Sequence, residues 1–270
     1  MKDLVYGREL RLMEITAIGL RLFLDNIKTI VKGILFIGLP ISVLLYFVQM
    51  RVMSVYEVLQ AFTEAQAAVS DGELLALSKQ MGLNNLLAMG ISTFLEPIFL
   101  IGVMKAVKRK LEGRETGGIR VYNEAMLLEG NVVKTGIIYL VCVFAGFLFV
   151  FPGIYLSVIW YFYLFCIGLV GRKGKDALAH SRDMVKGRWW KTLGFIIFLG
   201  ILRFGWNSIL QIFFMPFPVS VVSNILYTCV TYLTEGYIVC CMTVLFLNRE
   251  AGLFGLEDLQ EEVLVEAEEK

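Results

Sequence analysis

The stretch of sequence that decides the fold is residues 135–171, which read TGIIYLVCVFAGFLFVFPGIYLSVIWYFYLFCIGLVG. It contains no Asp, Glu, Lys or Arg, and one Pro152-Gly153 pair interrupts it near its middle. A helix needs about 20 mostly apolar residues to cross about 30 Å of hydrocarbon, because it rises about 1.5 Å per residue. The stretch is long enough for two crossings and predicts a hairpin of two membrane-spanning helices that turns at Phe151-Pro152-Gly153.

The rest of the chain is also rich in apolar residues. Hydrophobic residues make up 57% of it, charged residues only 18%, and the mean hydropathy is +0.71. A soluble domain carries about 25% charged residues. We therefore predict an all-α polytopic membrane helical bundle over residues 1–249, followed by an acidic cytoplasmic tail over residues 250–270. The stretches long enough to span are residues 33–50, 86–107, 135–151, 153–171, 193–214 and 219–247.

The distribution of Lys and Arg predicts the orientation. Basic residues gather in the N-terminal segment, in residues 105–134 and in residues 172–191, whereas the stretch between the first two spans keeps only Arg51 and Lys79. Short cytoplasmic loops carry an excess of Lys and Arg, so both termini are expected in the cytoplasm. The outer stretch is predicted to form two short surface helices, broken at Ser70 to Glu73, where the spacing fits a capping box. We favour a packed lid there over a ligand-binding loop.

A short pattern recurs before the first, third and fifth spans. Each ends in Lys-Thr, at Thr29, Thr135 and Thr192, after a small or amide turn residue. We interpret this as three copies of one unit, an interfacial helix followed by a two-span hairpin. The alternative is convergence on a common pattern at the membrane boundary. In the third copy, residues 174–190 have an amphipathic pattern typical of a helix that lies on the membrane.

Three segments carry a resemblance to a known family. They are FPGIYL at residues 151–156, ALAHSRDMVKGRWWKTLG at residues 177–194 and FLNREAG at residues 246–252. The chain resembles a broad prokaryotic family of six-span proteins that includes the membrane domain attached to some glycerophosphodiester phosphodiesterases and many stand-alone proteins. The resemblance implies the fold and a bacterial cytoplasmic membrane. It implies no activity, because the phosphodiesterase chemistry belongs to a separate metal-dependent barrel for which this chain has no room.

Three ionisable residues are predicted to lie at membrane depth: Glu96, Arg203 and Glu235. A charge there costs several kcal/mol unless it is paired or hydrated. We expect Arg203 to pair with one or both glutamates and so to hold the bundle together. The functional alternative is a polar track for a proton, an ion or a lipid headgroup.

Clustered bases near the predicted inner interface form a second candidate site. Membrane topology explains most of them, but each base near the surface also attracts anionic lipids by about 1 kcal/mol. The candidate contacts to anionic phospholipids are Lys105, Lys108, Arg109, Lys110, Arg172, Lys173, Lys175, Arg182, Lys186 and Arg188. Nucleic-acid binding is not indicated.

No arrangement of residues indicates catalysis. The five cysteines all fall inside apolar segments, and His180 is the only histidine, so neither a zinc site nor a Ser-His-Asp set is expected. His180 is expected to contact headgroups or the interface. We therefore predict no enzyme activity, no cofactor and no metal. The chain is interpreted as a structural, regulatory or lipid-associated membrane module; the alternative is a small transporter or lipid-handling protein that uses Glu96, Arg203 and Glu235.

Overall fold

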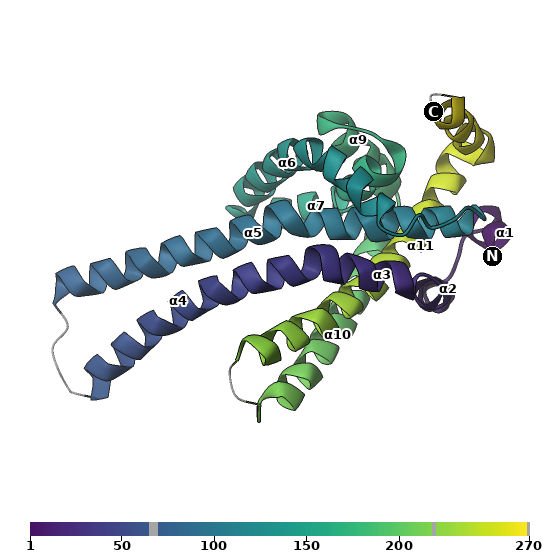
Figure 1. The fold of residues 1–270 in the computed structure, drawn as a ribbon. Helices are drawn as coiled ribbons and strands as arrows, with labels where there is room; N and C mark the ends of the chain where they lie inside the picture. The colour runs from purple at the N-terminus through teal and green to yellow at the C-terminus, as the bar shows by residue number, and fades with distance from the viewer. Residues whose placement is uncertain (65–69, 218–219, 269–270) are drawn as a thin grey trace.

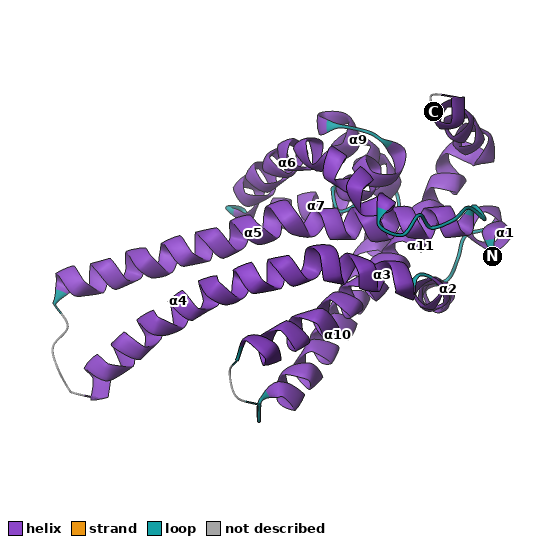
Figure 2. Ribbon diagram, viewed as in Figure 1, coloured by secondary structure: helices purple, strands orange, loops and turns teal. Residues whose placement is uncertain are grey.

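The computed structural model describes residues 1–64, 70–217 and 220–268, with the side chains of Thr63 and of residues 254–268 outside the description. Within these ranges the regular structure is helical, and no strand occurs (Figure 2). Two elements, η1 and η2, are π-helical turns. In chain order the elements are α1 (Lys2–Gly7), α2 (Leu12–Asp25), α3 (Ile27–Gly33), η1 (Ile34–Gly38), α4 (Leu39–Glu64), α5 (Asp71–Leu111), α6 (Arg120–Phe147), α7 (Phe151–Ile159), α8 (Tyr163–Phe165), η2 (Cys166–Val170), α9 (Gly174–Val185), α10 (Trp189–Phe214) and α11 (Val221–Glu268).

Six helical segments in the described residues are long and apolar enough to cross a membrane. The chain is thus an all-α polytopic bundle, as the sequence predicts. An even number of crossings places the start of the first segment and the end of the last at the same end of the bundle. The segments are Ile27–Phe62, Asp71–Leu111, Arg120–Phe147, Phe151–Val170, Trp189–Phe214 and Val221–Leu253.

The first two spans form a long hairpin that projects from the rest of the molecule (Figure 1). At about 1.5 Å per residue, the 41 residues of α5 extend about 60 Å, twice the hydrocarbon thickness. The prediction of two short surface helices forming a packed lid is therefore wrong, because α4 and α5 continue outward as unbroken helices. No proline interrupts them between residues 51 and 64 or between residues 71 and 96. The predicted capping box is confirmed, with Ser70 Oγ accepting from the Glu73 amide at 3.3 Å and Glu73 Oε2 accepting from the Ser70 amide at 3.1 Å.

Tyr122 of α6 holds the first helices together at the core. Its ring is buried between Gly33 of α3 and Gly102 of α5, and a Cβ atom at either glycine would lie 2.2 Å from the ring. Its hydroxyl donates a 3.1 Å hydrogen bond to the carbonyl of Thr29. Both positions need glycine because only a residue without a side chain allows the helix backbones to approach the ring so closely.

The fourth span is a broken helix. Its hairpin turn lies one step earlier than the sequence predicts, since the turn ends at Val150 and Pro152 occupies the first turn of α7. The helix then breaks between Ile159 and Tyr163. Ser181 of α9 enters this break, where its hydroxyl donates to the Ile159 carbonyl at 2.9 Å and accepts from the Phe162 amide at 3.1 Å. The break is possible at membrane depth because α9 satisfies the freed backbone groups.

The three Lys-Thr threonines occupy matching places. Each is buried, and each side chain contacts a residue near the C-terminal end of the second, fourth or sixth span or just after it. Thr29 Oγ1 lies 3.2 Å from Thr116 Oγ1, Thr135 Oγ1 accepts from the Gly174 amide at 3.0 Å, and Thr192 Oγ1 accepts from Arg249 Nη1 at 2.7 Å. We call these three contacts the threonine clasps. They support the interpretation of three repeated units, because each clasp closes one two-span hairpin at the same end of the bundle.

The repeat differs from the prediction in one respect. A separate helix precedes the first span (α2) and the fifth span (α9). The prediction of a separate helix before the third span is wrong. Residues 120–134 are instead the first turns of the continuous helix α6. In the third unit, Gly187 has a φ of +75° and separates α9 from α10. In the second unit, Gly130 keeps a helical backbone, so the helix runs on into the span.

Candidate functional site

The intramembrane charges meet where α10 and α11 pack together. Arg203 Nε of α10 lies 2.6 Å from Glu235 Oε1 of α11, so the predicted pairing of Arg203 is confirmed for this glutamate. The contact is an ion pair whose angles do not meet hydrogen-bond geometry. Glu96 of α5 bonds to Ser92 on its own helix and remains within electrostatic reach of Arg203.

Two tyrosines that sequence reasoning missed belong to the same cluster. Tyr161, in the break of the fourth span, lies within electrostatic reach of Arg203 and Glu235, and Tyr232 of α11 lies within reach of both glutamates. The Arg203 side chain is 54% exposed and the Glu235 side chain is 17% exposed. The pair therefore lies at the side of the bundle, with the arginine facing outward.

Nine of the ten predicted lipid contacts divide into two groups. Lys105 and Arg109 both pair with Glu124, at 3.1 Å and 2.6 Å, and Lys108 donates to the Leu169 carbonyl at 2.9 Å. These three bases at the end of α5 therefore link α5 to α6 and to the end of the fourth span. The exposed members are Lys110, Arg172, Lys173, Lys175, Arg182 and Lys186, and they remain available to headgroups.

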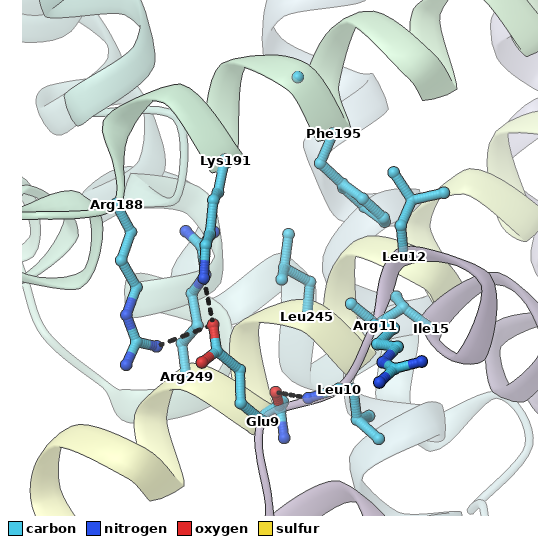
Figure 3. Close-up of a pocket in the computed structure, with 12 residues that line it drawn as sticks. Glu9, Leu10, Arg11, Leu12, Ile15, Arg188, Lys191, Phe195, Leu245 and Arg249 are labelled. Carbon is cyan, nitrogen blue, oxygen red and sulfur yellow. Dashed lines mark hydrogen bonds and ion pairs between the residues drawn. The ribbon is translucent and has the colours of Figure 1, made fainter.

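The tenth predicted contact, Arg188, lines a basic pocket between α2, α10 and α11 (Figure 3). The pocket has a volume of about 640 Å³, and its described lining includes one acid, Glu9, and four bases. It lies where α2 and α10 begin and where the sixth span ends, so two helix N-termini add partial positive charge. The remaining lining residues are mostly apolar. The four bases are Arg11, Arg188, Lys191 and Arg249.

Glu9 provides the pocket's internal anion. Its Oε1 lies 3.1 Å from Lys191 Nζ and 3.9 Å from Arg188 Nη1, and Figure 3 shows its side chain directed toward both bases. The hydrogen bond from Lys191 and the charges of Arg188 and Lys191 lower the pKa of Glu9 below its usual 4.5. Glu9 and the two bases are partly exposed, so solvent weakens this pairing and the carboxylate can be displaced.

Three consecutive polar residues, 248–250, lie at the end of the sixth span, and the first two of them line the pocket. Asn248 donates to the carbonyls of Val5 and Arg8 at 2.6 Å and 2.7 Å, and its Oδ1 accepts from the Leu10 amide at 3.1 Å. This amide fixes the N-terminal segment that carries Glu9.

The other two residues of the triplet reach α10 and α9. Arg249 is 5% exposed, makes the third threonine clasp and has its guanidinium carbon 5.7 Å from the centre of the Phe162 ring. Glu250 is buried against α9, with His180 Nε2 2.9 Å from its Oε2. His180 is thus a buried partner of α11, and the prediction that it contacts headgroups or the interface is wrong.

Sequence reasoning missed most of this pocket. It singled out Arg188 but did not select Glu9, Lys191 or Arg249. One signal was present, because three polar residues in a row, 248–250, directly follow an apolar span. Three polar side chains that must be desolvated need specific partners, and those partners can be identified only from the fold.

The four bases and the two helix N-termini make the pocket suited to holding an anion. In the described ranges no group of three or more His, Cys, Asp or Glu side chains could hold a metal ion. Comparison with known proteins adds no assignment: no family model, no curated protein and no solved structure matches this chain.

Proposed function

We propose that this chain is a non-enzymatic membrane module that associates with anionic phospholipids and serves a structural or regulatory role in a bacterial cytoplasmic membrane, with both termini in the cytoplasm. The observation that carries the proposal is the basic pocket, where four bases surround the one acid among its described lining residues. A phosphate diester placed there would gain charge-assisted hydrogen bonds from these bases. A zwitterionic headgroup would gain less, because its own cation offsets the charge of its phosphate.

The exposed bases around the pocket support the same function. Lys173 and Lys186 flank α9, and Lys175 lies in its first turn. Trp190 at the start of α10 is 78% exposed, as is typical of a residue at headgroup depth. These groups would hold a layer of anionic lipid around the bundle at low affinity. The resemblance to the six-span prokaryotic family remains part of this proposal.

A second candidate is a small transporter or lipid-handling protein that uses the intramembrane cluster. The outward position of Arg203 favours the lipid-handling form of this alternative, because the guanidinium faces the side of the bundle that lipid chains would cover. We keep it second, since Arg203 and Glu235 neutralise each other and a paired charge is also expected from stability alone.

The test is the thermal stability of the purified full chain in nanodiscs. Discs of phosphatidylcholine are compared with discs in which phosphatidylglycerol replaces a rising fraction of it. The unfolding midpoint should rise with phosphatidylglycerol, and the rise should shrink as salt increases, because exposed charges are screened. A midpoint that is independent of phosphatidylglycerol would overturn the proposal.

A further inference from the structure

A second hollow follows the basic pocket along the same three helices. It is an apolar groove of about 750 Å³ between α2, α10 and α11. On α10 the pocket is lined by Phe195 and the groove by Ile201 and Gly205; on α11 the order is Leu245 and then Ile238. On α2, Ile15 lines the pocket and Leu20 lines the groove. The pocket and the groove thus adjoin along α10 and α11, with rising residue number on α10 and falling residue number on α11, and α2 borders both hollows.

The dimensions of this path match one leaflet of a membrane. Phe195 and Gly205 are ten positions apart on α10, which is about 15 Å along a helix axis. Half of the bilayer's hydrocarbon thickness is also about 15 Å. A lipid with its charged headgroup beside Lys191 would therefore have an acyl chain in the groove.

The two hollows have complementary chemistry. The groove is lined almost entirely by apolar side chains, with Arg203 already neutralised by Glu235, whereas the pocket collects bases. Glu9 makes the contacts to Lys191 and Arg188 that a lipid phosphate would make. A charged head joined to an apolar chain fits both hollows, and neither a free anion nor an uncharged chain does.

We propose that the basic pocket and the apolar groove form one binding site for a single anionic glycerophospholipid, with its phosphate at Arg188 and Lys191 and an acyl chain along α10. The inference rests on the proposed function, since it requires a preference for anionic lipid. It adds that one lipid per chain is bound saturably. The phosphate displaces the Glu9 carboxylate from the two bases.

Two glycines of α10 allow a matched test of the groove. A Cβ atom at Gly205 or at Gly200 would meet no atom within 4 Å, so leucine fits the fold at either position. Gly205 lines the groove, whereas Gly200 lines neither hollow. Gly205→Leu fills the path of the acyl chain, and Gly200→Leu is its control. For the headgroup, Lys191→Gln with Arg188→Gln is compared with Lys186→Gln, an exposed base outside the pocket.

The experiment is native mass spectrometry of the full chain released from neutral detergent that contains equal amounts of dioleoyl phosphatidylglycerol and dioleoyl phosphatidylcholine. The chain should retain one phosphatidylglycerol. Retention should fall by at least roughly tenfold in Gly205→Leu and in the Arg188 and Lys191 double variant, which corresponds to a loss of about 1.4 kcal/mol of binding free energy. Gly200→Leu and Lys186→Gln should retain the lipid like the unaltered chain.

Each other outcome overturns a stated part of the proposal. Equal retention in Gly205→Leu and Gly200→Leu would show that the chain does not use the groove. Displacement of the lipid by glycerol 1-phosphate at similar concentration would identify a site for free phosphate esters. No preference for phosphatidylglycerol over phosphatidylcholine would defeat this inference and the proposed function together, whereas a preference untouched by either substitution would defeat only the inference.

Discussion

Arg249 Nη1 donates a 2.7 Å hydrogen bond to Thr192 Oγ1, and this contact joins the C-terminal part of the sixth span to the first turn of the fifth. Thr192 also bonds back to the Arg188 carbonyl at 2.9 Å, so one hydroxyl serves both its own helix and its partner helix. The contact lies beside the basic pocket, which makes the third threonine clasp part of the wall that positions Arg188.

Removing the clasp hydroxyls should destabilise the third unit more than the second. Thr192→Val leaves a buried guanidinium without this acceptor and should cost about 1.5–3 kcal/mol, as for other hydrogen bonds to charged groups. Thr135→Val leaves only the Gly174 amide without its acceptor and should cost about 1 kcal/mol. Thr228 donates to the Asn224 carbonyl of its own helix, so Thr228→Val is the control for a bond within one helix. Reversible unfolding in mixed micelles measures the three free energies; equal costs at Thr192 and Thr228 would contradict the clasp.

The Arg203–Glu235 pair predicts a favourable double-mutant coupling. Arg203→Leu leaves Glu235 without its cation at membrane depth and should cost about 1–3 kcal/mol, because an unpaired buried group carries its full desolvation penalty. Adding Glu235→Gln removes the charge and should recover much of the loss. Gln211→Leu, an exposed polar position on the same helix, serves as the control. If the two substitutions proved simply additive, the pair would have no stabilising role.

Surface labelling should place the start of α5, at the far end of the long hairpin, and α9 on opposite sides of the membrane. Lys79→Cys near the start of α5 should react with a membrane-impermeant maleimide from outside intact cells, and Lys175→Cys should react only after the membrane is opened. Both positions are exposed. Of the natural cysteines, Cys166, Cys240 and Cys241 are buried, and a cysteine-free background removes the other two as well. Reaction of Lys175→Cys from outside would reverse the predicted orientation.

The sequence predicts the bundle well because lipid solvation leaves few choices. Runs of apolar residues as long as 135–171 must form helices, since no backbone group can be left without a partner in hydrocarbon. The pairing of Arg203 follows from the same physics, as an arginine cannot lose its proton to avoid burial. These features depend on local composition and on neighbouring spans.

The features that the sequence did not reveal depend on distant contacts. Whether residues 51–64 fold back as a lid or continue outward depends on what they pack against, and nothing local ends the helix. The break in the fourth span requires Ser181 from another helix. The basic pocket brings Glu9 next to Lys191, 182 positions away in the chain, and no periodicity encodes that separation.

The last prediction concerns Glu9 and pH. Its pKa lies below 4.5 in the folded chain because of Lys191 and Arg188, so the pairing contributes stability above pH 4.5 and loses it as pH falls through the lower folded value. Glu9→Gln should thus lower the free energy of unfolding at pH 7 by roughly 0.2–1 kcal/mol, the contribution of an exposed ion pair. In phosphatidylcholine discs this appears as a slightly lower unfolding midpoint. The difference between the two proteins should vanish only once the pH has fallen below that lower folded pKa, since both then carry a neutral side chain in the folded chain.

Glu14→Gln provides the matched control for this pH profile. Glu14 bonds to Arg8 and to the Arg11 amide, and these contacts lower its pKa to about 2, so its stabilising effect should persist to more acid pH than that of Glu9. The Glu9 substitution should also strengthen the retention of phosphatidylglycerol at pH 7, because the lipid phosphate no longer competes with a tethered carboxylate for Lys191 and Arg188. Glu14→Gln should leave retention unchanged, since Glu14 does not line the pocket. Weaker retention in Glu9→Gln would mean that Glu9 supports the headgroup instead of competing with it.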